Sequence, residues 1–102
     1  MSRPLVLAAL AALALPLLAQ NAVAGPIENA CMRADRGNRA LCGCIQQVAD
    51  MTLRGADQRK AATFFKDPDK AHDTWMSKRS SDDAFWERYK AFGATAEARC
   101  AG

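Results

Sequence analysis

Four cysteines place the strongest limit on how this chain can fold: Cys31, Cys42, Cys44 and Cys100. One glycine separates Cys42 from Cys44, and two positions along an α-helix correspond to about 200° of rotation. On a helix these two thiols point to opposite sides and cannot bond to each other, so each needs a different partner. The sequence favours Cys31–Cys42 with Cys44–Cys100 and leaves open the crossed pairing, Cys31–Cys44 with Cys42–Cys100.

The beginning of the chain has the pattern of an export signal. Residues 1–24 hold 18 of the 51 hydrophobic residues and a single charged one. After a short basic start, the apolar run Leu5–Ala19 precedes Ala22 and Ala24, small residues at the positions that a signal peptidase requires. We predict a signal peptide cleaved after Ala24. A membrane anchor is the weaker alternative, because spanning takes about 20 apolar residues.

The remaining residues, 25–102, are predicted to form one small, soluble domain that depends on its disulfides. They contain nine Leu, Ile, Val and Phe residues in 78 positions, and loss of the first 24 residues lowers the formal net charge from +3 to +2. A fraction of these side chains below roughly 20% gives a thin hydrophobic core, which covalent bridges can supplement. Disulfides behind an export signal indicate an oxidising compartment. We expect the periplasm, with an extracellular location as the second choice.

The domain is predicted to be all-α, a small bundle of four to five short helices stapled by two disulfides. Ala is abundant, β-branched residues are scarce, and no alternating pattern is present. The expected helices are 26–35, 39–54, a third that Asp57 caps and that ends near Phe65, 68–78 with Asp67 as its cap, and a last helix that begins at the serines Ser80 and Ser81.

Apolar residues at helical spacing predict which helix faces are buried. In the helix 39–54 the expected inward stripe is Leu41, Ile45, Val48 and Thr52. In the last helix it is Phe85, Tyr89, Phe92, Ala96 and Cys100, so the stripe that packs the core also delivers the last cysteine to its partner.

The residue types needed for catalysis or for a bound metal are poorly represented. His72 is the single histidine, which removes most acid–base and triad schemes, and there is no C-x-x-C motif for zinc or haem. Asp67, Asp69 and Asp73 lack the rest of a calcium loop. The pair around Gly43 permits thiol–disulfide exchange as a minor alternative. We predict no enzyme activity, no cofactor, no metal and no nucleic-acid partner.

All seven aromatic residues lie between Phe64 and Phe92, and most are expected in the core. The alternative is a ligand or partner surface on which tryptophans stay exposed beside acids. Such a surface would accept a small cation such as a guanidinium group. Its candidate residues are Trp75, Trp86, Asp73, Asp82 and Asp83.

Several segments together resemble a family of short exported alphaproteobacterial proteins. They are the stretch from Ile27 to Cys31, the block LCGCIQQVAD at 41–50, DQRKAA at 57–62 with FFKDP at 64–68, and DAFWERYKAF at 83–92. Some members of that family carry the label "arginine transporter". The resemblance therefore implies a role as an accessory of arginine or cationic amino-acid transport, and it supplies no catalytic or binding residues.

A literal transporter conflicts with the size of the chain, because one removable signal helix cannot form a path across a bilayer. The sequence instead predicts a periplasmic binding or interaction module whose partner is a periplasmic protein or a small cationic ligand. The accessory role in arginine transport and thiol exchange through Cys42 and Cys44 are the two alternatives. After cleavage of the signal, no membrane span is expected.

Overall fold

The computed structural model describes residues 24–34 and 38–101 of the chain. The predicted signal segment, apart from Ala24, lies outside these residues. The described part is all-α, as predicted, and consists of five helices, which are α3 (Pro26–Ala34), α4 (Arg39–Thr52), α5 (Gly55–Lys66), α6 (Pro68–Met76) and α7 (Ser80–Cys100). Within these residues, no helix has the length and apolar character needed to cross a membrane.

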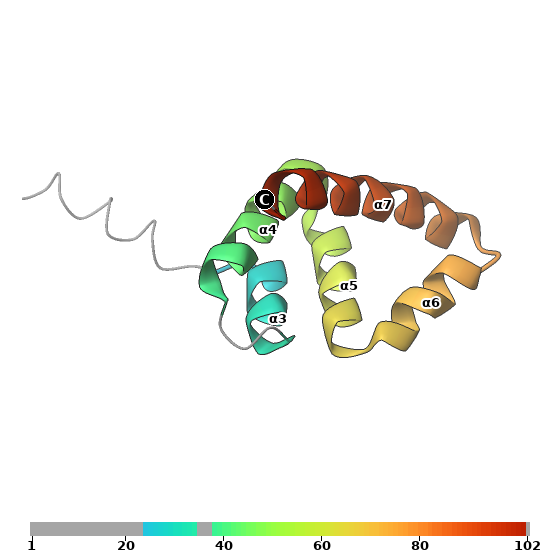
Figure 1. Cartoon of the computed structure of the whole chain (residues 1–102). Helices are drawn as coiled ribbons and strands as arrows, with labels where there is room; N and C mark the ends of the chain where they lie inside the picture. The colour runs from blue at the N-terminus through green and yellow to red at the C-terminus, as the bar shows by residue number, and fades with distance from the viewer. Residues whose placement is uncertain (1–23, 35–37, 102) are drawn as a thin grey trace, which may run out of the picture.

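The helices form a bundle in which the last helix closes onto the second (Figure 1). Helix α3 packs on both α4 and α5, and it runs beside α5 in the same direction. Helix α6 connects the far end of α5 to the start of α7. Helix α7 then returns along the bundle, so its C-terminal end lies against α4.

Two helix boundaries differ from the sequence-based expectation because the backbone turns before Gly55. Helix α4 ends at Thr52, since Leu53 is extended and its N–H still donates to the Ala49 carbonyl at 2.8 Å. Helix α5 begins at Gly55, so Asp57 lies in the first turn and is not the cap. The side chain of Leu53 is buried in the core, directly after the point where the helix ends.

The caps of the last two helices follow the prediction only in part. Asp67 caps α6 as expected, because its carboxylate accepts from the Asp69 N–H at 3.2 Å. Helix α6 ends at Met76, two residues before the predicted end. Helix α7 begins at Ser80 as predicted, but no serine caps it, since Arg79 occupies the cap position and makes no side-chain capping bond.

The buried face of α4 is rotated relative to the predicted stripe. Val48 is buried as expected, whereas Leu41, Ile45 and Thr52 are only half-buried. The buried positions also include Cys42, Gln46 and Ala49. The rotation has a physical reason: α4 must present Cys42 to α3 and Cys44 to α7 at once, so the covalent bonds determine which face turns inward.

Two disulfides tie three helices together in the favoured pairing. Cys31 of α3 bonds to Cys42 of α4, with their Cα atoms 5.5 Å apart, and Cys44 of α4 bonds to Cys100 of α7, with Cα atoms 5.8 Å apart. Both bridges pass through α4, on opposite flanks of that helix. The geometric argument from one intervening glycine is confirmed.

The hydrophobic core runs through the bundle and is completed by aromatic rings. Its buried members are Ile27, Val48, Ala49, Leu53, Ala61, Phe64, Phe85 and Phe92. The predicted stripe of α7 is confirmed, because Tyr89, Ala96 and Cys100 pack against this core between and beyond the buried phenylalanines. The ring of Tyr89 lies within 6.0 Å of four other ring centroids, those of Phe64, Phe85, Trp86 and Phe92.

Candidate functional site

The five residues predicted to form a cation-binding surface are distributed over two helices and have different surroundings. Trp75 on α6 is 58% exposed, and its ring contacts that of His72 at 5.7 Å between centroids. Trp86 on α7 instead packs beside Tyr89, at 5.2 Å. Asp73 and Asp83 are exposed, whereas Asp82 is buried.

The carboxylate of Asp82 is already committed to internal partners. Lys60 donates to its Oδ1 at 2.8 Å, and Nε of Arg79 lies 3.4 Å from its Oδ2. The hydrogen bond from Lys60, followed by one from the Ser77 hydroxyl, lowers the pKa of Asp82 to about 2. An incoming guanidinium group would have to displace Lys60, so this acid ties α5 to α7 and is a poor receptor for a cation.

A polar hollow of about 410 Å³ lies where α5, α6 and α7 meet, and it includes two of the predicted acids, Asp73 and Asp82. It also contains three cations, which are Lys60, Lys70 and Arg79. Neither Trp75 nor Trp86 lines it. The predicted combination of aromatic rings with free acids is therefore not assembled at this hollow.

The cysteine pair around Gly43 has no free thiol. Cys42 and Cys44 are both bonded, each to a different helix, and the side chain of Cys42 is fully buried. Thiol exchange here would have to begin with attack on one of these bridges. Among the described residues, no group of three or more His, Cys, Asp or Glu side chains is placed to hold a metal ion.

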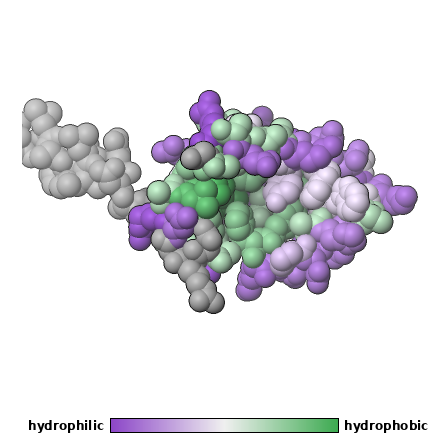
Figure 2. Space-filling view, viewed as in Figure 1, coloured by the Kyte–Doolittle hydropathy of each residue, from purple (hydrophilic) through white to green (hydrophobic). Residues whose placement is uncertain are grey.

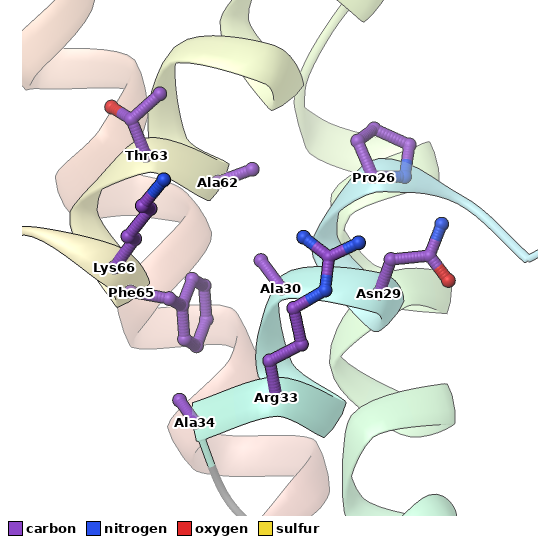
Figure 3. A pocket seen from close by; sticks show the side chains of 9 residues that line it. All are labelled: Pro26, Asn29, Ala30, Arg33, Ala34, Ala62, Thr63, Phe65 and Lys66. Carbon is purple, nitrogen blue, oxygen red and sulfur yellow. The ribbon is translucent and has the colours of Figure 1, made fainter.

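A larger groove, of about 650 Å³, separates α3 from α5 (Figure 3). The ring of Phe65 points from α5 toward Ala30 and Ala34 of α3. Most of the remaining surface is also hydrocarbon, and the lining residues are Pro26, Asn29, Ala30, Arg33, Ala34, Ala62, Thr63, Phe65 and Lys66. Figure 2 shows hydrophobic residues gathered on the face where α3 and α5 lie. The groove falls in the size range of small-molecule sites.

Among the described residues, the groove is lined by two charged side chains, both of them cations and one on each wall. Arg33 stands in the last turn of α3 and Lys66 in the last turn of α5. Within residues 24–34 and 38–101, neither side chain forms a salt bridge. In the described part of the chain, the groove thus combines an apolar floor with two cations that form no salt bridge.

Helix α3, one wall of the groove, is held in place by a covalent bond and a polar network. The Cys31–Cys42 bridge fixes its middle to α4. The buried Gln46 of α4 accepts from the Glu28 N–H at 2.8 Å and donates to Gln58 and Asp50 at 2.9 and 2.8 Å. Ile27, fully buried, anchors the first turn. The wall is therefore rigidly positioned even though α3 is short.

Sequence patterns did not indicate this groove. Alanine is common throughout the chain, so Ala30, Ala34 and Ala62 carry no distinguishing signal. Arg33 and Lys66 stand at helix C-termini, where cations are favoured by the helix dipole in any case. The one available signal was Phe65, a second phenylalanine directly after the buried Phe64, which must point away from the side that Phe64 fills.

Comparison of the chain with protein-family models, with curated proteins and with solved structures finds no match in any of the three. Functional conclusions therefore depend on the geometry of the chain itself.

Proposed function

We propose that this protein is exported to the periplasm and acts there as a non-catalytic binding module, with its ligand seated in the α3–α5 groove. The observation that carries the proposal is the groove itself, an apolar hollow of about 650 Å³ on an otherwise tightly cross-linked small domain. A preformed apolar hollow with a few polar groups is the usual form of a small-molecule site.

The export part of the proposal is supported by the disulfides and by where the first described helix begins. Helix α3 starts at Pro26, so cleavage after Ala24 would remove no helix of the described bundle. N-terminal sequencing of the exported protein should give a first residue of Gly25. A protein that retains Met1 after export would contradict the cleavage.

The cations of the groove disfavour a cationic ligand, so the accessory role in arginine transport gains no support from this site. Like charges placed together repel, and Arg33 and Lys66 line both walls. Among the described residues, the groove contains no carboxylate or imidazole that could activate the Thr63 hydroxyl or the Lys66 amine as a nucleophile. These features support binding in preference to reaction.

The experiment uses the protein exported through its own N-terminal segment and purified in its oxidised form. It is incubated with small molecules extracted from the periplasm, washed, and analysed by native mass spectrometry. The variant Ala34→Trp fills the groove, and Ala94→Trp places the same ring on an exposed site of α7 outside it.

A molecule retained by the wild-type protein and by Ala94→Trp, but lost in Ala34→Trp, is the expected result. Circular dichroism should show that both variants keep their helices. Retention of nothing, or equal retention by all three proteins, would remove the groove as the functional site.

A further inference from the structure

The chemistry of the groove allows the ligand class to be named. We infer that the α3–α5 groove binds a small amphipathic carboxylate, with its hydrocarbon chain against Phe65 and the alanines and its carboxylate held by Arg33 and Lys66. This inference deepens the proposed function and depends on the groove being the binding site.

The hydrocarbon part follows from the floor of the groove. The side chains of Ala30, Ala34 and Ala62 are single methyl groups, and the ring of Phe65 closes the space between the helices (Figure 3). Among the described residues, no carboxylate side chain lines the groove. A flexible alkyl chain can follow such a surface and gains about 0.8 kcal/mol per buried methylene group, whereas a polar molecule would lose hydration there without hydrogen bonds in return.

The carboxylate follows from the position of the cations. Helices α3 and α5 run side by side in the same direction, so their last turns, which carry Arg33 and Lys66, lie at the same end of the groove (Figure 1). In Figure 3 the Arg33 side chain lies along α3 beside Ala30 and Asn29, and the Lys66 side chain lies along α5 toward Thr63, so the two cations are on opposite walls. The planar guanidinium group of arginine binds a carboxylate through two parallel hydrogen bonds, and a lysine opposite it supplies a second positive charge.

The helix dipoles act against an anion at this end, and their size shows which effect prevails. A helix C-terminus carries the equivalent of about −0.5 charge. Two helix ends therefore offset one of the two full positive charges, and a net positive charge remains for the ligand. The balance predicts a preference for one negative charge, as in a monocarboxylate, over a dianion.

The test compares three probes with the same eight-carbon chain, namely octanoate, octan-1-ol and octylammonium. Binding to the oxidised, exported protein is measured by isothermal titration calorimetry and by ligand-observed NMR, below the concentrations at which the probes aggregate. We expect octanoate to bind most tightly, the alcohol more weakly and octylammonium not at all. Equal binding of octanoate and octylammonium would overturn the inference.

Variants then locate the carboxylate. Removing both cations in Arg33→Gln/Lys66→Gln should weaken octanoate binding about tenfold or more and leave octanol binding nearly unchanged. The matched control, Arg59→Gln/Lys78→Gln, removes two exposed cations outside the groove and should bind octanoate as the wild-type protein does. Equal weakening in both double variants would show that only the overall charge matters and would contradict the site.

The outcomes separate this inference from the function on which it depends. One outcome is that octanoate fails to bind although a molecule extracted from the periplasm binds the wild-type protein and not Ala34→Trp. In that case the groove remains the functional site and the carboxylate class is wrong. If size-exclusion chromatography shows a dimer that Ala34→Trp disrupts, a second copy occupies the groove and the inference is overturned. If Ala34→Trp binds octanoate as the wild-type protein does, the site itself is wrong.

Discussion

The two ends of the bundle solve the same shortage of aliphatic side chains in different ways. At the cross-linked end, α3, α4 and the last turn of α7 are joined by two disulfides, and the buried aliphatic side chains Ile27 and Val48 are accompanied by small or polar groups such as Ala49 and Gln46. At the aromatic end, α5 and the first half of α7 are joined by edge-to-face contacts of Phe64 with Phe85 and Tyr89 and by the Lys60–Asp82 ion pair, without a covalent link.

The difference explains where a groove can exist. Large rings fill the space between α5 and α7, and the hollow that remains at the aromatic end is lined mainly by polar residues. At the cross-linked end, α3 buries only two side chains, Ile27 and the bonded Cys31, and methyl groups of α3 line the groove that faces α5. A helix held by a disulfide can therefore leave apolar side chains uncovered, whereas a helix held by packing alone would have to bury them against its neighbours.

Reduction of the two disulfides should have the largest effect on stability, because it removes both covalent links of the cross-linked end. The loops closed by the bridges span 11 and 56 residues, which correspond to about 3 and 4 kcal/mol of stabilisation. A loss of about 7 kcal/mol is comparable to the whole stability of a typical domain. We expect the reduced protein to be largely unfolded at 25 °C by circular dichroism.

Mass spectrometry must confirm that all four thiols are free in the reduced sample. An unchanged melting temperature in that sample would show that the bundle is stable without its bridges, and the contrast between the two ends would then fail.

Removal of a buried ring from the aromatic end should cause the second largest loss of stability. Phe85 is 2% exposed and contacts the rings of Phe64 and Tyr89, with the Lys60 ammonium 4.6 Å from its centroid. We expect Phe85→Ala to lower the free energy of unfolding by about 3 to 5 kcal/mol in urea titrations. Trp75→Ala, which removes a larger but exposed ring, should change it by less than about 0.5 kcal/mol. Similar losses in both variants would mean that ring burial does not support this end.

The aromatic end was the more predictable of the two from sequence. Phe85, Tyr89 and Phe92 repeat at helical spacing, and this pattern identified the buried stripe of α7 correctly. The face of α4 was misplaced because its spacing pattern contains no information about the directions of two disulfides. The buried Gln46 would be expected on a solvent-exposed face, and only its three hydrogen bonds explain its burial.

The candidate site was less predictable than the fold for a related reason. A concave surface depends on which side chains are small where two helices approach, and the approach of α3 to α5 is set by a disulfide to a third helix. Residue type alone points to side chains such as Trp75 and Asp82. Whether such a side chain is free to bind a ligand depends on its neighbours in space, which the sequence does not show. Asp82 proved to be an internal ion-pair partner.

Gly25 lies close to the side chain of Gln46, so a substitution at Gly25 tests whether the Gln46 hydrogen bonds contribute to stability at the cross-linked end. A Cβ atom at this position would overlap the side-chain amide of Gln46, and that amide cannot easily move because it bonds to Glu28, Asp50 and Gln58. We expect Gly25→Ala to destabilise the oxidised protein by about 1 to 3 kcal/mol.

The matched control is Gly93→Ala, where a Cβ atom meets nothing within 4 Å inside a helix. It should stabilise the protein by up to about 1 kcal/mol. Urea titrations of both variants give the comparison, and a stabilising Gly25→Ala would indicate that the Gln46 network is loose and does not hold α3.

The smallest expected effect is a dependence of stability on pH at the aromatic end, where the ion pair of Asp82 with Lys60 links α7 to α5. Its pKa is lowered from 3.8 to about 2 in the folded protein, chiefly by the hydrogen bond from Lys60. A lowered pKa means that the stabilisation is fully present above pH 3.8 and is lost as the pH falls toward 2.

Urea titrations at pH 7, 4 and 2 should therefore show Asp82→Asn less stable than the wild-type protein at pH 7, with the difference shrinking by pH 2. Asp83→Asn, an exposed neighbour, is the control for overall charge. A difference that stays constant over this range would mean that Asp82 stabilises the bundle through packing, and that charge does not link α5 to α7.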